Sequence, residues 1–223
     1  MRNLSLILLA ALTCGTSAYG ATFSATGATA TSEFNGFYDA GNTIDGSGLS
    51  LPGDPAASHG DYDVNNHWTT ATGETLGESI TWTFASPETF GGIYIWNHRS
   101  NSVSSNPNYD VVLFDLTVLG AGASVLADFT NVTMAPDTDL SQAYFAPSLI
   151  PGVEAIRFTV RGTQNSNVSS FTGLAEVLFD DANAIAGAAD LSAGAAAVPL
   201  PASLPLLLAG LAGLGLWRRK THA

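Results

Sequence analysis

The stretch WNHRSNSVSSNPNY, which begins at Trp96, contains the side chains best suited to hold a small ligand. It leaves an apolar run and continues as a long polar segment. A sugar site needs a flat apolar face for the ring, together with charged or amide groups that bond the hydroxyls. We therefore select His98, Arg99, Asn101 and Tyr109 as candidate ligand-binding residues. Two simpler roles stay open, because Trp96 lies within a strand and is expected in the core, and Arg99 could merely pair with a carboxylate.

A second stretch, HGDYDVNNH at residues 59–67, has the oxygen spacing that begins a calcium loop. The sixth and twelfth positions lack the Gly and Glu of such a loop, which excludes the helix-loop-helix type. His59 and His67 together with Asp61 could hold a transition metal, but they form no tight ligand pair. We therefore expect residues 51–67 to form a solvated insertion loop.

Nothing in the sequence indicates catalysis. The segment LGAGAS at residues 119–124 has two glycines of a dinucleotide fingerprint, but it lacks the third, and a strand rather than a helix follows. It is typical of a hairpin turn. The chain contains no nucleophile elbow, no pair of histidines on a helix and no phosphate-binding loop. The sequence therefore favours a non-enzymatic protein.

The charge of the chain is strongly acidic and is unevenly placed. Four of the seven basic residues lie at the two ends, and all 19 Asp and Glu lie between them. The body keeps three arginines, Arg99, Arg157 and Arg161, and has a net charge of −16. Such a surface repels nucleic acid and anionic membranes, keeps an exported protein soluble and suits divalent cations. We expect no nucleic-acid partner.

The apolar pattern of the body has a period of two, which predicts strands. The segments are short, rich in aromatic or β-branched residues, and bounded by Gly, Pro, Asn and Ser. The pattern predicts an all-β fold, a single β-sandwich over residues 21–181. The expected strands cover residues 79–84, 92–97, 111–119, 124–129, 142–147, 154–162 and 173–179, with residues 22–31 as a further edge strand.

Both ends of the chain are predicted to be targeting segments. Residues 1–20 contain Arg2, an apolar run and a small-residue cleavage site, as a secretory signal peptide does. Cleavage after Gly20 leaves a chain without cysteine, and therefore without disulfides. Residues 182–197 are rich in Ala and Gly and predict a flexible spacer.

The C-terminal segment, residues 198–223, predicts a transmembrane helix with a basic cytoplasmic end. Val198 to Trp217 spans about 30 Å if helical, the thickness of a hydrocarbon core. The basic end keeps the C-terminus in the cytoplasm. It comprises Arg218, Arg219 and Lys220.

This order of VPLPA, apolar helix and RRK resembles the VPLPA variant of the PEP-CTERM sorting signals. The resemblance implies recognition by an exosortase of a Gram-negative bacterium, a transient inner-membrane anchor, and export to the cell envelope, cell surface or extracellular matrix. Removable anchors share this logic of a short motif followed by an apolar tail. The motif residues are Val198, Pro199, Leu200, Pro201 and Ala202.

The order of motifs in the body resembles a discoidin or galactose-binding-like domain, which is a jelly-roll sandwich. NTIDGSGLS precedes the tryptophan segment NNHWTT, then come GESITWTF and GGIYIWNHRS, and IRFTVRG and GLAEVLF close the order. The long insertion at residues 51–67 departs from the family pattern. The resemblance implies a non-catalytic module whose ligands bind in loops at one end of the sandwich.

The same resemblance implies a structural Ca²⁺ at the Asp-Gly turn, closed by a Glu of the last strand. Matched residue by residue, it points to Asp45 and Glu176, with backbone carbonyls near Asn42 and Gly48. Calcium takes about six to eight oxygen ligands, which carboxylates and turn carbonyls supply. The alternative is that Asp45 only stabilises its turn and that Glu176 is an exposed strand residue.

Two functions from different classes follow. The body is either a module that binds a polysaccharide, or a structural matrix or adhesion component without a small ligand. Its expected partners are the exosortase and the export machinery, with a polysaccharide in the first case.

Overall fold

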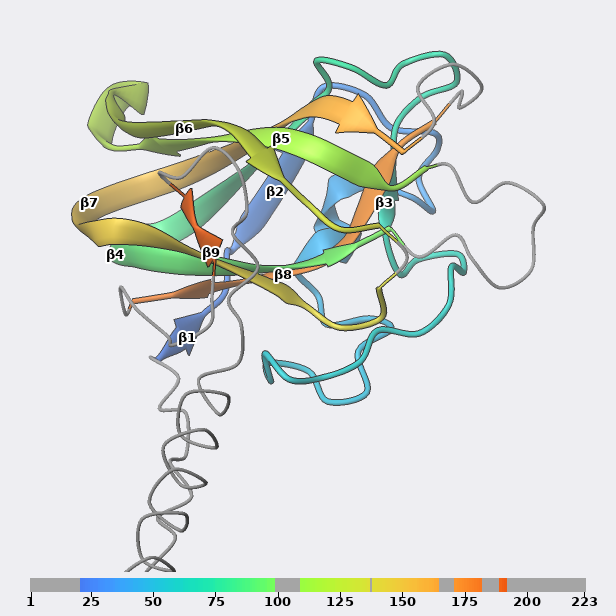
Figure 1. Ribbon diagram of the computed structural model, residues 1–223, viewed down its shortest axis with the longest axis horizontal. Coiled ribbons are helices and arrows are strands. Elements are labelled where there is room, and N and C mark those ends of the chain that lie inside the picture. The colour runs from blue at the N-terminus through green and yellow to red at the C-terminus, as the bar shows by residue number, and fades with distance from the viewer. Residues whose placement is uncertain (1–20, 99–108, 137, 165–170, 182–188, 192–223) are drawn as a thin grey trace, which may run out of the picture.

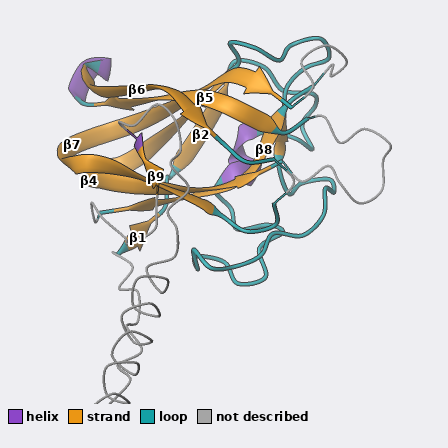
Figure 2. Cartoon of the chain, viewed as in Figure 1, coloured by secondary structure: helices purple, strands orange, loops and turns teal. Residues whose placement is uncertain are grey.

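The computed structural model describes residues 21–98, 109–136, 138–164, 171–181 and 189–191. They form an antiparallel β-sandwich, apart from one short parallel pair (Figure 1). Two 3-10 turns, η1 (Ala40–Thr43) and η2 (Ala121–Ala123), are the helical elements of this part of the chain (Figure 2). The strands are β1 (Thr22–Phe23), β2 (Gly27–Ala30), β3 (Trp68–Thr69), β4 (Ser79–Asn97), β5 (Val111–Leu119), β6 (Val125–Thr133), β7 (Gln142–Thr163), β8 (Gly173–Asp180) and β9 (Ala189–Asp190).

Two long strands, β4 and β7, hold the sandwich together because each belongs to both layers. The first part of β4 pairs with β2 and with the last part of β7, which continues to β5 and β6. The second part of β4 pairs with β8 and with the first part of β7. Register shifts near Glu88 mark the bend of β4, as expected where bulges bend a strand. The bends lie at the left of Figure 1, and many of the loops gather at the opposite end.

The main core lies between the layers and consists of the inward-facing residues of both. Trp82 of the first layer contacts Phe158 of the same layer and Phe179 of the second, with ring centroids 6.1 Å and 5.7 Å away. A smaller core lies on the outer side of the second layer, where Trp96 is fully buried and donates a hydrogen bond from Nε1 to the Ala57 carbonyl. The expectation that Trp96 belongs to the core is confirmed.

The predicted strands are present, but the bends make two of them longer. Residues 79–84 and 92–97 are parts of one strand, β4, and residues 142–147 and 154–162 are parts of β7. The predicted edge segment at residues 22–31 divides into β1 and β2. The glycine-containing segment at residues 119–124 connects the antiparallel pair β5 and β6, which confirms the hairpin turn.

The boundary of the body differs from the sequence prediction. Residues 182–197 were predicted as spacer, but β9 lies within this range and pairs in parallel with β7, with Tyr144 opposite Ala189. Leu191 is buried in the main core. The signal peptide and the sorting signal, from Val198 to Lys220, lie outside the described residues. Within the described ranges no helix has the length and apolarity needed to cross a membrane.

Candidate functional site

A closed circuit of aromatic and histidine rings lies where the chain leaves β4. His98 directly follows β4, and His67 directly precedes β3. Around them each ring contacts the next, with centroid separations of 4.1 to 5.7 Å. We call this set the loop-end cluster. Its members are Phe34, Tyr38, Tyr62, His67, His98, Tyr109 and Phe171.

Asn97 fixes the position of His98. The buried Asn97 amide donates to the carbonyls of Val111 and Ala135, at 2.8 and 3.1 Å. Its Oδ1 accepts hydrogen bonds from the backbone N–H groups of His98 and Val111. The end of β4 is therefore tied to the start of β5, and the backbone that carries His98 is held on both sides.

The two histidines are buried and uncharged. Burial lowers the pKa of His67 to about 2, helped by the nearby His98 and His59. Burial also lowers the pKa of His98 to about 3, with a smaller contribution from His59. Because desolvation disfavours the charged form of a base, both rings are neutral at physiological pH.

The ring nitrogens of this pair are mostly left without hydrogen bonds. His67 Nδ1 lies 2.6 Å from Asn66 Oδ1, so the neutral ring donates there and keeps Nε2 as an acceptor. His67 Nε2 and both ring nitrogens of His98 have no hydrogen-bond partner in the described structure. A neutral imidazole offers one donor and one acceptor. The buried cluster thus holds polar atoms that match the hydroxyl groups of a ligand.

Tyr62 contacts both histidines and is itself partly exposed. Its ring lies 4.1 Å from the ring of His67 and 5.0 Å from that of His98, and its side chain is 41% exposed. Partial burial raises its pKa above the ordinary range, and a hydrogen bond with the Tyr38 side chain adds to this effect. Tyr62 is therefore a partly exposed aromatic residue in contact with both histidine rings.

Gly173 allows the strands beneath the cluster to approach closely. A Cβ atom at this position would lie 2.0 Å from the Trp68 carbonyl oxygen and 2.9 Å from Cδ2 of His98. Only glycine leaves this space, which is one reason why a glycine interrupts an apolar strand. The close pairing of β3 with β8 brings His67 and His98 to the same end of the sandwich.

The expectation of a solvated loop at residues 51–67 is wrong for part of that range. Ala57 and His59 are buried, and Ala57 packs in the smaller core beside Trp96. Both ring nitrogens of His59 lie near carbonyl oxygens, Nδ1 at 2.9 Å from Gly60 and Nε2 at 3.1 Å from Ser47. No group of three or more His, Cys, Asp or Glu among the described residues is arranged as a metal site. The transition-metal reading of this loop gains no support.

The structure places the candidate ligand residues as follows. His98 and Tyr109 lie together in the loop-end cluster, with ring centroids 5.6 Å apart. Arg99 and Asn101 lie outside the described residues. Sequence reasoning missed Phe34, Tyr38, Tyr62 and Phe171 and took His67 only as a metal candidate. A signal was present in the pattern HGDYDVNNHW, where an aromatic residue lies near a histidine just before a tryptophan strand.

The Asp45–Gly46 turn lies next to Glu176 of β8. The Gly46 N–H donates to Glu176 Oε2 at 3.0 Å, and the turn has Gly46 at φ +76°. Glu176 is buried rather than exposed. Desolvation, helped by the nearby Asp45 carboxylate, raises its pKa to about 9, although hydrogen bonds from the Gly46 and Val177 backbone oppose this shift. The alternative that Glu176 is an exposed strand residue is therefore wrong.

Asp45 and Glu176 are the two carboxylates that could hold a hard cation at this turn. A buried carboxyl beside a second carboxylate is costly to ionise unless a positive charge is supplied, and calcium prefers oxygen ligands of this kind. Asp45 Oδ1 also accepts the Ser47 N–H at 2.7 Å, so this residue stabilises its turn as well. The Asn42 amide is used structurally, since it donates to the carbonyls of Phe37 and His67, each at 3.0 Å. Any contribution of Asn42 to calcium would come from its oxygens.

Several solved carbohydrate-binding domains are similar to this chain in fold. The CBM32 domain of AlyQ, in complex with 4,5-unsaturated mannuronic acid, is 18% identical, with 72% of this chain and 98% of that chain covered and a TM-score of 0.48. The family 32 CBM of NanJ from C. perfringens, in complex with galactose, is 20% identical over 69% and 91%, with a TM-score of 0.47. A fucose binding module from Streptococcus pneumoniae is 13% identical over 74% and 96%, with a TM-score of 0.48.

The likeness to these domains concerns the all-β antiparallel sandwich. No family model matches the chain, and no curated protein matches it in sequence.

Proposed function

We propose that the described sandwich is a non-catalytic carbohydrate-binding module and that the loop-end cluster is its binding site. The observation that carries this proposal is the pair of buried neutral histidines, which leave three ring nitrogens unpartnered within the described structure and contact the partly exposed ring of Tyr62. A buried polar group without a partner costs about 1–3 kcal/mol. A ligand that supplies hydrogen bonds to these atoms would recover that cost.

The chemistry of the cluster suits a sugar better than an ion or an apolar ligand. A sugar hydroxyl both donates and accepts, so it can bond a ring N–H and a bare ring nitrogen alike. The aromatic faces of Tyr62 and Tyr109 suit the C–H face of a sugar ring. Arg99 and Asn101, which follow His98 in the chain, are proposed to add charged and amide donors.

A structural Ca²⁺ at Asp45 and Glu176 forms part of the proposal. The two residues lie on different elements, the turn after η1 and strand β8. A cation between them would supply the positive charge that the Glu176 carboxylate lacks. It would also join the start of the sandwich to its last long strand.

The location of the module is proposed from the two ends of the sequence. A signal peptide at residues 1–20 would direct export, and the VPLPA-type signal at residues 198–223 would be recognised by an exosortase during a transient inner-membrane stage. The body would then act in the envelope, at the cell surface or in the extracellular matrix of a Gram-negative bacterium. Its acidic charge fits such an exported protein.

A glycan array, probed with the isolated body in calcium and in chelator, tests this function most directly. We expect retention on at least one polysaccharide of the producing cell. Tyr62→Ala should weaken it about tenfold, because the variant removes the partly exposed ring that lies against both histidines. Leu76→Ala is the matched control, since Leu76 is an exposed apolar residue outside the cluster.

A folded body that binds no polysaccharide would contradict the proposal. The protein would then be better described as a structural matrix or adhesion component. Binding that is equal in the Tyr62→Ala variant and in the wild type would show that the ligand lies elsewhere on the body.

A further inference from the structure

The outer face of the first layer contains a hollow that is separate from the loop-end cluster. Its volume is about 280 Å³, and hydroxyl groups dominate its lining. A volume near 300 Å³ is at the lower end of the range for ligand pockets and suits a single small ring. The lining residues are Thr29, Ala30, Thr31, Ser79, Thr81 and Arg157.

Strand register brings the polar residues of this hollow side by side. Thr29 of β2 lies opposite Thr81 of β4, and Thr81 lies opposite Arg157 of β7. Alternate residues of a strand point to opposite faces. The neighbours Ile80 and Trp82 are accordingly buried in the core, while the row of Thr29, Thr81 and Arg157 faces outward. The site is therefore fixed by the sheet rather than by a loop.

Arg157 is a cation that the surrounding protein does not neutralise. Its Nε donates to Thr81 Oγ1 at 3.4 Å, a long hydrogen bond, and no ion pair of Arg157 occurs among the described residues. The carboxylate of Glu78, next to the hollow in sequence, accepts a hydrogen bond from Thr31 at 2.5 Å. The terminal N–H groups of the Arg157 guanidinium are therefore available to a ligand at the edge of the hollow.

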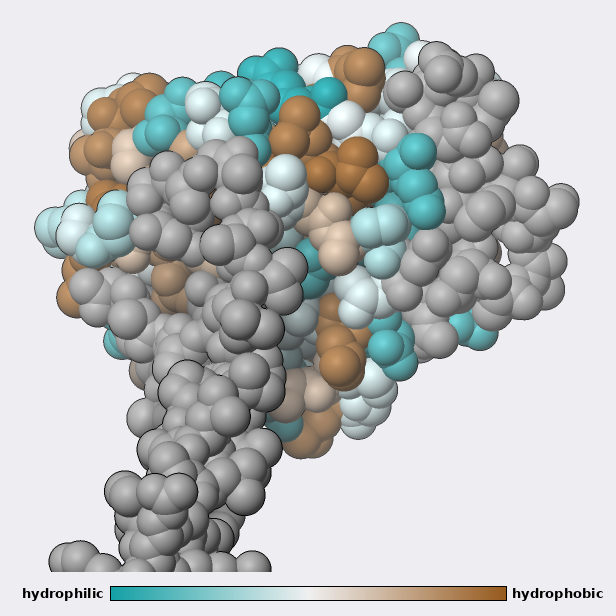
Figure 3. Space-filling model, in the orientation of Figure 1, coloured by the Kyte–Doolittle hydropathy of each residue, from teal (hydrophilic) through white to brown (hydrophobic). Residues whose placement is uncertain are grey.

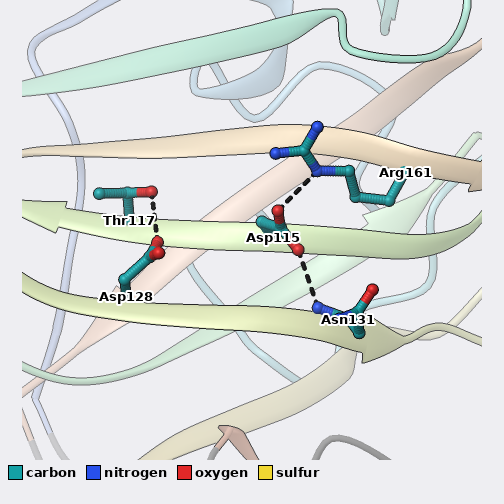
Figure 4. A network of polar contacts seen from close by, with 5 residues as sticks. All are labelled: Asp115, Thr117, Asp128, Asn131 and Arg161. Carbon is teal, nitrogen blue, oxygen red and sulfur yellow. Dashed lines mark hydrogen bonds and ion pairs between the residues drawn. The ribbon is translucent and has the colours of Figure 1, made fainter.

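Arg161, on the same face of β7, shows the contrasting case. Its Nε lies 2.5 Å from Asp115 Oδ2, and Asp115 Oδ1 accepts the Asn131 N–H at 2.8 Å (Figure 4). Asp115 is largely buried and is held on both sides, so this pair is a structural element of β5, β6 and β7. In a body with 19 carboxylates, Arg157 stands out because its charge is left available.

We propose that this hollow is a second binding site, which takes a carboxylate-bearing sugar residue such as a uronate. The planar guanidinium fork matches a carboxylate, and the threonine and serine hydroxyls bond the hydroxyls of the ring. The lining contains no aromatic ring, so recognition here is polar and depends on the charge. This inference does not depend on the loop-end cluster.

The acidic charge of the body limits how much negative charge a ligand can carry, but it does not prevent the binding of one carboxylate. Charges farther away than about 8 Å are largely screened at physiological ionic strength. A direct contact with Arg157 is much shorter, so the local attraction exceeds the general repulsion for one carboxylate. In a densely charged polyanion, the acidic sugars that do not contact Arg157 would be repelled by the acidic surface of the body. An isolated or terminal acidic sugar is therefore the preferred ligand.

The test is a titration of the body with D-glucuronate, followed by NMR at the Arg157 Nε–H resonance, with D-glucose as the neutral comparison. We expect glucuronate to shift this resonance in a saturable way and glucose to leave it unchanged. Arg157→Gln should weaken glucuronate binding at the neighbouring Thr81 amide by about tenfold or more, the loss expected for a charged hydrogen bond. Arg161→Gln should leave it unchanged.

The Tyr62→Ala variant separates this inference from the function proposed above. The Arg157 response to glucuronate should persist in that variant even if neutral glycans no longer bind. An equal response to glucose, unchanged binding in Arg157→Gln, or an equally strong response to inorganic sulfate alone would each overturn the assignment of an acidic-sugar site.

Discussion

The rings of His67 and His98 meet edge to face, with centroids 4.8 Å apart and planes at 86°. One residue precedes β3 and the other follows β4, so the contact exists only in the folded sandwich. His98 makes protonation of His67 less favourable, in addition to the cost of burial, which lowers the pKa of both rings. The pair is therefore an uncharged hydrogen-bonding unit.

We predict that acid destabilises the body through these two histidines. Their pKa values are lowered from 6.5 to about 2 and about 3 in the folded state, so the unfolded chain binds more protons below pH 6.5. The contribution of the two neutral histidines to the free energy of unfolding is fully present above pH 6.5 and is lost as the pH falls toward their folded-state pKa values. Urea unfolding at pH 6.5 and 4.5 should show a loss of about 2–3 kcal/mol per histidine. His98→Gln should reduce this loss of stability. An unchanged pH dependence in that variant would show that the buried His98 does not cause the acid destabilisation.

Calcium should raise the thermal stability of the body. If the ion joins Asp45 and Glu176, it binds only the native state, and a concentration a hundred times its dissociation constant adds about 2.7 kcal/mol. Thermal melts in calcium and in chelator measure the difference. Glu176→Gln should abolish the difference in melting temperature. Equal melting temperatures of the wild type in both buffers would show that calcium does not stabilise the body.

Replacement of Arg99 by alanine should weaken the retention of a neutral glycan while the fold stays intact. Loss of one charged hydrogen bond costs about 1.5–3 kcal/mol, which is tenfold or more in affinity. Arg157→Ala is the control, because Arg157 lies on the outer sheet face, away from the loop-end cluster. Affinity electrophoresis compares the three proteins, and equal retention of Arg99→Ala and wild type would assign Arg99 no role in binding.

Gly173→Ala should destabilise the sandwich by about 1–3 kcal/mol or more, as expected for overpacking. The added methyl group would collide with the Trp68 carbonyl and the His98 ring. Gly36→Ala provides the comparison, since a Cβ there meets nothing within 4 Å. Urea unfolding should show a lower midpoint for the first variant only. If Gly173→Ala were as stable as Gly36→Ala, the close approach of β3 and β8 would not be required.

The mature protein should lack residues 204–223 and be found in the envelope or outside the cell. This expectation follows from the VPLPA motif, the apolar run and the basic end. Intact-mass analysis of the protein from its native cell measures the result directly. A native mass that includes the complete tail would show that the segment is not processed.

Much of the fold was predictable from the sequence because strands have a local signature. The alternation in VVLFDLTVL predicted β5 with its bounds at Val111 and Leu119. The bends of β4 and β7 were not predictable in this way, since Pro87 and Pro151 are typical of strand ends as well as of bends. β9 was missed because a two-residue strand has too few residues to show a period.

The candidate site was predictable only where its residues are close in the sequence. His98 was selected because it follows a tryptophan strand and precedes a polar segment. Tyr62 and Phe171 are far from it in the chain, and only the pairing of β3 with β8 brings these segments together. The burial of His67 was also hidden, because the sequence around it is polar and indicates a solvated loop.

The sharing of β4 and β7 between the two layers has a consequence for how the body comes apart. The two layers are joined through the continuous backbone of β4 and β7, so opening one layer frees one half of each strand that the other layer contains. Partial unfolding of one layer would also expose the aromatic core between them. The sandwich is thus expected to open as one cooperative unit, with amide exchange of both layers governed by the same free energy.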